Sequence, residues 1–149
     1  MTGKERRISM FKNILVAYDG SDGSKRALER AIHLAKESGS AITALWVRGS
    51  LPHYPETVDE VEEEREAADA FLQKIVKDLL HYSKEYGIEV KGDSRSGHPA
   101  KTIVDYAKES HIDLIVMGHR GHSGLWGGFL GHTTDKVSEN AHCSVLIVR

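Results

Sequence analysis

Cysteine, proline and long apolar runs are all scarce in this sequence. Cys143 is the single cysteine, so an internal disulfide is excluded and we interpret Cys143 as a structural thiol. A chain without disulfides is typical of a reducing compartment, and we expect a cytoplasmic protein. No apolar run approaches the about 20 residues that a membrane-spanning helix needs. No apolar segment follows the basic N-terminal residues either, so neither membrane insertion nor secretion is predicted.

An excess of charge of one sign is also missing. The formal net charge is −2, although 28% of the residues are charged. A nucleic-acid-binding surface is usually recognised by a strong basic excess, so the composition does not predict a nucleic-acid partner. With 40% hydrophobic residues, the 149 residues are enough for the core of one domain. We divide the chain into a basic N-terminal tail, residues 1–9, and one domain, residues 10–149.

Two common nucleotide-binding fingerprints are absent as well. The P-loop pattern G-x-x-x-x-G-K-[ST] does not occur, and no G-x-G-x-x-G turn follows the first predicted strand. No Ser-His-Asp or paired-carboxylate arrangement can be argued from spacing. Any binding site must therefore be sought in other features of the chain.

Apolar runs alternate with helical patterns along the whole chain. Strands are predicted at residues 13–18, 41–47, 88–91, 113–117 and 144–148, with the short run 88–91 as an edge strand. The helices between them include one that ends at Gly39, one over 58–86, one from Pro99 and one over 134–140. The acidic start of the second helix is interpreted as a solvated face. This alternation predicts an α/β fold: a parallel sheet with helices on both faces.

Glycine is concentrated in one stretch, from Met117 to Thr134, where it provides six of eighteen residues. The stretch follows an apolar strand and leads into a helix. Glycine-rich backbone can turn its N–H groups towards a ligand, and a helix N-terminus favours anions. We interpret the stretch as a phosphate cradle. The alternative is a surface loop that serves packing alone.

Asp19 follows the first predicted strand, at the same edge of the sheet as the glycine-rich stretch. Ligands of open α/β sheets bind beyond the carboxyl ends of strands, where the strand order reverses. If the first and fourth strands are neighbours, Asp19 is suited to accept a hydrogen bond from a ribose hydroxyl there or to stabilise the glycine-rich stretch. Its alternative role is to cap the first helix.

Three parts of the chain together resemble the universal stress protein family. The spacing of Gly118, Gly121 and Gly131 matches the family signature G-x2-G-x9-G-[ST], and residues 12–21 and 143–149 are similar to its first and last strands. The resemblance implies a Rossmann-like, adenine nucleotide alpha hydrolase-like fold, with a five-stranded parallel sheet in the order 3-2-1-4-5. It further implies a stress-response protein that binds ATP in the cleft between strands one and four. A homodimer formed through the last strand is also implied.

The resemblance also implies which residues of this chain form the binding site, by their positions in the family's motifs. In chain order they are Ala17, Asp19, Val47, Gly118, Gly121, His122, Ser123, Gly131, Thr133 and Thr134. Ala17 and Asp19 would line the adenosine side, and Val47 would meet the adenine edge through its backbone. The next four residues would lie by the ribose and phosphates. The last three would hold the outer phosphates at the helix start.

His132 departs from the signature, which has Ser or Thr after the third glycine. Imidazole is larger than a hydroxyl and donates only in the right tautomer or when protonated.

Three hypotheses follow. The chain binds ATP or a related adenine nucleotide to regulate its dimer or partners; it hydrolyses ATP slowly, with Mg²⁺ carried by the phosphates; or His132 closes the phosphate site and the chain is an interaction protein. Clustered histidines around the loop could bind a transition metal, but their spacing matches no known set of metal ligands.

Overall fold

A computed structural model describes residues 10–49, 57–119 and 129–149. The predicted basic tail therefore lies outside the described residues. Strands and helices alternate in the order β1 (Asn13–Ala17), α1 (Asp22–Ser38), β2 (Ala41–Arg48), α2 (Val58–Tyr86), β3 (Val90–Ser96), α3 (Pro99–Glu109), β4 (Leu114–Gly118), α4 (Phe129–Asn140) and β5 (Ser144–Val148). The strands pair in parallel in one sheet, in the order β3-β2-β1-β4-β5. The predicted α/β class and the strand order are both confirmed.

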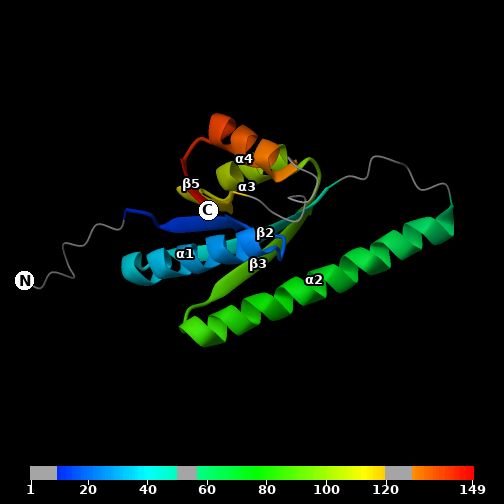
Figure 1. Ribbon diagram of the computed structural model, residues 1–149, viewed down its shortest axis with the longest axis horizontal. Helices are drawn as coiled ribbons and strands as arrows, with labels where there is room; N and C mark the ends of the chain where they lie inside the picture. The colour runs from blue at the N-terminus through cyan, green and yellow to red at the C-terminus, as the bar shows by residue number, and fades with distance from the viewer. Residues whose placement is uncertain (1–9, 50–56, 120–128) are drawn as a thin grey trace, which may run out of the picture.

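α1 and α2 cover one face of the sheet, and α3 and α4 cover the other (Figure 1). Alternate residues of the central strands point to opposite faces, so each face has a core of its own. Ile14 and Val16 pack with the buried side chains of α1 and α2. Leu15 and Ile115 pack with those of α3 and α4. Among the described helices, none is long and apolar enough to cross a membrane.

The ends of the first two helices follow from local chemistry. The side chain of Ser21 accepts a hydrogen bond from the amide of Ser24 and so caps the start of α1. Gly39 ends α1 in the left-handed conformation, as predicted, with φ of 70°. α2 covers the predicted residues; Thr57 caps its start, and Gly87 ends it in the same way as Gly39.

The predicted bounds of the third strand are wrong. The sequence pattern placed it at 88–91, whereas β3 runs from Val90 to Ser96. Ile88 instead donates its amide to the carbonyl of Ser83, which completes the end of α2. β2 offers a backbone partner for every residue of β3, so pairing outweighs the weak strand propensity of glycine, aspartate and serine. β3 is an edge strand, as predicted.

The predicted start of the last helix is also wrong. The apolar pattern placed it at Thr134, whereas α4 begins at Phe129. The helix therefore starts inside the glycine-rich stretch. Glycine has a low helix propensity, so the sequence pattern did not predict a helix there. As a consequence, Gly131 lies in the first turn of α4, and Thr134 lies in the second turn and not at the helix start.

Candidate functional site

The carboxyl ends of β1 and β4 form the point where the strand order reverses. β1 pairs with β2 on one side and with β4 on the other, and its ladder with β4 ends at Val16 and Val116. α1, the helix after β1, packs on one face of the sheet, and α4, the helix after β4, packs on the other (Figure 1). In open α/β sheets this point is the usual place for a ligand. Ala17 ends β1, Asp19 lies two residues after it, and Gly118 ends β4.

Asp19 holds the turn that leads into α1. Its Oδ1 accepts a hydrogen bond from the amide of Ser21 at 3.0 Å, and its own amide donates to Ser24 Oγ at 3.4 Å. Ser21, and not Asp19, is the residue that caps the helix. The alternative that Asp19 caps α1 is therefore wrong. The turn fixes a half-buried carboxylate at the carboxyl edge of β1.

The backbone of Val47 points to the side of β2 where β1 has ended. The carbonyl of Leu45 accepts from Tyr18, which is the last hydrogen bond between β1 and β2, and the carbonyl of Arg48 accepts from Gly97 on the β3 side. Backbone groups of successive strand residues point to alternate sides. The N–H and C=O of Val47 are consequently directed past the end of β1, towards the same edge as Asp19.

Gly118 is in close contact with the start of α1. A Cβ placed on Gly118 would lie 2.7 Å from the carbonyl carbon and oxygen of Gly23. Real Cβ atoms do not approach backbone so closely, so glycine is required here by packing between β4 and α1. The role by the ribose that the resemblance implies for Gly118 stays a prediction.

α4 is attached to the end of β4 by a buried hydroxyl. Thr134 is 3% exposed, and its Oγ1 donates to the carbonyl of Gly118 at 3.3 Å. Thr133 is half-buried and His132 is exposed. The predicted phosphate contacts of Gly131, Thr133 and Thr134 remain predictions. Gly121, His122 and Ser123 lie outside the described residues.

Tyr18 is a residue at this edge that the sequence analysis missed. It is 2% exposed, and its hydroxyl donates to Asp78 Oδ2 in α2 at 2.9 Å. Burial, together with the hydrogen bond and charge of Asp78, raises the pKa of Tyr18 well above its ordinary value. The bond ties the end of β1, one residue before Asp19, to α2. The position of Tyr18 at the end of the predicted strand 13–18 was the available signal, since a buried tyrosine hydroxyl usually has a partner.

The described residues hold no group of three potential metal ligands among histidine, cysteine, aspartate and glutamate. His119 donates its amide to the carbonyl of Val148, so its backbone belongs to the contact between β4 and β5. Cys143 is half-buried, and burial raises the pKa of its thiol. Both observations agree with structural roles for these two residues.

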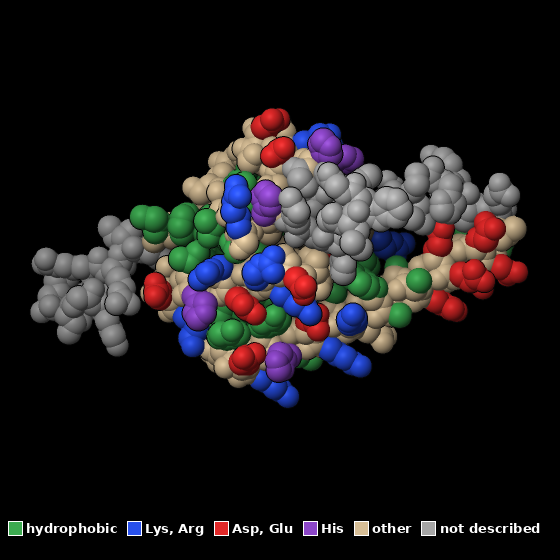
Figure 2. Space-filling view, in the orientation of Figure 1, with side chains coloured by type: hydrophobic (Ala, Val, Ile, Leu, Met, Phe, Trp, Pro, Cys, Tyr) green, Lys and Arg blue, Asp and Glu red, His purple; other side chains and the backbone are tan. Residues whose placement is uncertain are grey.

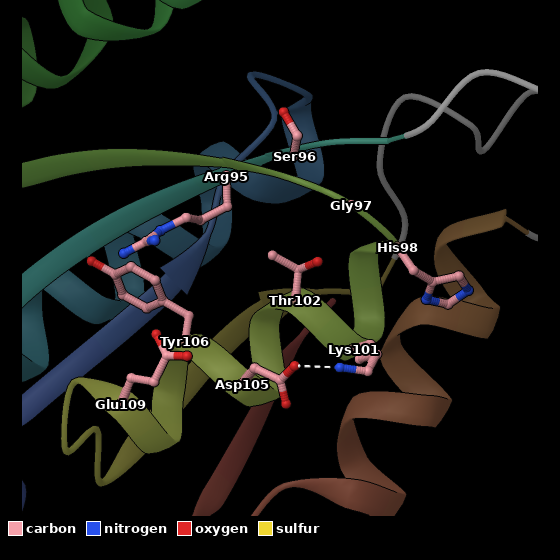
Figure 3. A pocket seen from close by; sticks show the side chains of 9 residues that line it. All are labelled: Arg95, Ser96, Gly97, His98, Lys101, Thr102, Asp105, Tyr106 and Glu109. Carbon is pink, nitrogen blue, oxygen red and sulfur yellow. Dashed lines mark hydrogen bonds and ion pairs between the residues drawn. The ribbon is translucent and has the colours of Figure 1, made fainter. Parts of the chain in front are cut away.

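A second polar site lies at the end of β3, where a pocket of about 360 Å³ opens beside α3 (Figure 3). Arg95 lies over the ring of Tyr106 at 5.2 Å, and the Tyr106 hydroxyl donates to Asp93 at 3.0 Å. Lys101 and Asp105 form an ion pair at 2.7 Å. These charges satisfy one another, so the pocket is held by internal contacts. The sequence analysis missed it because the predicted third strand stopped before Arg95.

Comparisons with known proteins bear on this geometry. The model of the universal stress protein family matches residues 10–149. The chain belongs to the universal stress protein family. It is 37% identical to universal stress protein YxiE of Bacillus subtilis, over 94% of this chain and all of that protein.

Solved structures of the universal stress protein family have the same fold. The protein UspA from Lactobacillus plantarum gives a TM-score of 0.80 at 30% identity, with 93% of this chain and 97% of that chain covered. A universal stress protein solved in complex with cAMP gives 0.72 at 27% identity, with 95% and 99% covered. A family member similar to this chain therefore binds an adenine nucleotide.

Proposed function

We propose that this universal stress protein binds ATP or a related adenine nucleotide at the carboxyl edge between β1 and β4. The observation that carries the proposal is the joint placement of Asp19 and Val47. A fixed carboxylate and a strand backbone without a β1 partner both lie at the carboxyl edge of the sheet, beside the point where the strand order reverses. The cAMP complex of a similar family member supports the same ligand class.

Each contact in the proposed site has a simple chemical basis. The backbone of Val47 offers a donor and an acceptor to the adenine edge, and Ala17 lines the adenosine side. Asp19 accepts from a ribose hydroxyl, because an ionised carboxylate is a strong acceptor. Gly118 provides backbone on the side that is not packed against Gly23. A base and a ribose are thereby recognised without any of the common fingerprints.

In the proposed site, the phosphates of the nucleotide bind at the start of α4 and at the segment before it. The backbone N–H groups of the first helical turn, which includes Gly131, favour an anion, and Gly121, His122 and Ser123 precede them in the chain. The hydroxyl of Thr134 is bound to the carbonyl of Gly118, so this residue acts by positioning the helix. With a triphosphate, Mg²⁺ is carried by the phosphates.

We also propose that the chain forms a homodimer through β5, the edge strand next to β4. Leu146 and Ile147 are 38% and 40% exposed on this strand. Exposed apolar residues on an edge strand favour pairing with another strand. Nucleotide binding beside β4 then provides a regulatory connection to the dimer, since β4 and β5 are directly paired.

The test combines retained ligand with measured affinity. Native mass spectrometry of the freshly purified protein is expected to show a bound adenine nucleotide, and calorimetry with ATP, AMP and cAMP gives the preference. Asp19→Asn is expected to weaken binding about tenfold, the effect of losing one hydrogen bond to a charged group. The Asn side-chain oxygen can still accept from Ser21, so the turn is kept. Asp59→Asn, an exposed carboxylate on α2, is the matched control.

Two results would contradict the proposal. One is wild-type protein that retains no nucleotide and shows no heat of binding with any of the three. The other is equal affinity in the wild type, Asp19→Asn and Asp59→Asn. The first result would favour the alternative in which His132 closes the phosphate site and the chain acts only through protein contacts, and the second would place the nucleotide away from Asp19. Substitution of Gly118 is unsuitable for this test because it disturbs the packing on Gly23.

A further inference from the structure

The first part of α2 extends beyond the sheet as an acidic arm, which we define as residues 58–66 (Figure 1). The buried residues of α2 are Ile75, Leu79 and Tyr82, all in its second half. Six of the nine arm residues are acidic and one is Arg65. Acidic side chains accordingly gather at this end of the molecule (Figure 2). The arm takes no part in the core.

The acidic arm also carries an apolar strip. Val58 is 74% exposed and Val61 is 39% exposed. Residues three apart on a helix lie side by side, so these two valines form one small apolar surface. Glu62 flanks it one residue on. A helix with exposed valines and flanking carboxylates suits docking to an apolar surface with a basic rim.

A groove of about 520 Å³ lies on the opposite face of the sheet, between α3 and α4. We call it the lysine groove; it is lined by His98, Ala100, Lys101, Val104, Lys108, Lys136 and Asn140. Ala100 and Val104 are buried and form an apolar floor. No carboxylate is among the lining residues. The groove therefore combines an apolar floor with a basic rim.

Two of the three lysines of the lysine groove are available for an incoming charge. Lys101 is paired with Asp105 at 2.7 Å. Within the described part of the chain, neither Lys108 nor Lys136 forms a salt bridge. A groove with this chemistry suits an amphipathic helix with acidic flanks, because such helices place apolar residues on the floor and charges at the rim.

We propose that the acidic arm of one copy docks in the lysine groove of a second copy. The arm cannot fill the groove of its own chain, because α2 packs on one face of the sheet and α3 and α4 pack on the other. Val58 and Val61 meet the floor at Ala100 and Val104. Glu62 and Glu63 face Lys108 and Lys136.

This contact differs in kind from the proposed pairing of β5. The β5 surface is apolar strand edge, whereas the arm and the groove are joined mainly by opposite charges. Attraction between exposed charges is weakened by salt, since the screening length falls from about 10 Å at 0.1 M to about 3 Å at 1 M. The arm–groove contact is therefore the salt-sensitive part of self-association, and it requires no nucleotide.

The proposal is tested by sedimentation velocity of full-chain variants in which the charges of the arm or of the groove are reversed. One variant reverses the arm, Glu62→Lys with Glu63→Lys, and a second reverses the groove, Lys108→Glu with Lys136→Glu. Each alone is expected to weaken the salt-sensitive association by about tenfold per reversed charge. An equimolar mixture of the two restores it, because each arm then meets a groove of opposite charge.

Matched controls carry the same charge changes elsewhere on the surface. Glu37→Lys with Glu89→Lys serves for the arm, and Lys84→Glu with Lys91→Glu serves for the groove; all four residues are exposed. The controls are expected to associate as the wild type does. Three results overturn the proposal: a wild-type mass that is independent of salt, controls that lose association equally, or a mixture that stays at the masses of its separate components.

Discussion

Gly118 lies so close to Gly23 that a side chain on Gly118 would overlap the carbonyl group of Gly23, with a carbon–oxygen distance of 2.7 Å. Gly118 is the last residue of β4, and Gly23 lies in the first turn of α1, the helix that follows β1. Their contact brings the first turn of α1 and the end of β4 together at the proposed nucleotide site. The first glycine of the signature is thus needed by the fold itself.

Gly118→Ala is expected to lower the free energy of unfolding by about 1–3 kcal/mol, because the methyl group forces the backbone of α1 away from β4. Urea unfolding measures the change. Gly49→Ala is the control, since a Cβ at Gly49 meets nothing within 4 Å, and a change within about 0.5 kcal/mol is expected. Equal stability of both variants and the wild type would contradict the packing role of Gly118.

Removal of the serine cap of α1 and removal of the threonine cap of α2 are expected to have different effects on the free energy of unfolding. Ser21→Ala removes the cap of α1, a helix buried in the core, and is expected to cost about 1 kcal/mol in urea unfolding. Thr57→Ala removes the cap of α2, whose first turns are exposed. That loss is confined to fraying of the arm, so global stability is expected to stay within about 0.5 kcal/mol.

Hydrogen exchange separates the two outcomes. Thr57→Ala is expected to speed exchange in the first turns of α2 alone. A global loss of stability in Thr57→Ala, equal to that in Ser21→Ala, would show that the arm is part of the cooperative core.

Tyr18→Phe removes the hydroxyl that donates to Asp78 and keeps the ring in the core. The expected cost is about 1–3 kcal/mol, because a hydrogen bond to a carboxylate is lost. Tyr86→Phe is the control; the described residues give its hydroxyl no hydrogen bond. Chemical unfolding of both variants provides the comparison, and an unchanged Tyr18→Phe would mean that water replaces the bond at no cost.

Alkaline pH is expected to destabilise the protein through its tyrosines. Burial and the charge of Glu29 raise the pKa of Tyr82 from 10.0 to about 12 in the folded state. The unfolded state therefore loses this proton first. The contribution of Tyr82 to the free energy of unfolding is fully present below pH 10 and is lost as the pH rises from 10 through 12.

Absorbance of tyrosinate measures this effect. Ionisation in the folded protein should lag behind ionisation in urea, and Tyr82→Phe should show a shallower loss of unfolding free energy over the same range. Tyr18 acts in the same direction, with a pKa raised further above its ordinary value. Coincident titration curves for folded and unfolded protein would contradict the prediction.

Dimerisation through β5 is expected to fail when a charge is placed on the exposed edge. At about 1 M salt, where the arm–groove contact is weakened, Ile147→Lys should reduce the mass in sedimentation equilibrium from dimer to monomer, because a lysine on the apolar edge must be desolvated on pairing. Leu80→Lys, an exposed apolar residue on α2, is the control. A dimer that survives Ile147→Lys and persists at high salt would place the interface elsewhere.

The sequence alone determined most of the fold. Apolar runs fixed the central strands, and the helix ends at Gly39 and Tyr86 appeared where expected, because capping depends on a few neighbouring residues. The signature glycines Gly118, Gly121 and Gly131 identified the family, and with it the strand order. These features are local or depend on spacing, so they can be read without the tertiary structure.

Only the tertiary structure decided the features that depend on a partner distant in sequence. β3 extends to Ser96 because β2 offers its backbone there, and Gly118 is packed against Gly23. Thr134 is bound to the carbonyl of Gly118, and Tyr18 to Asp78. Such contacts join segments far apart in the chain, and their residues carry no periodic pattern. Their physical cause is proximity in the folded sheet, which propensity and spacing do not encode.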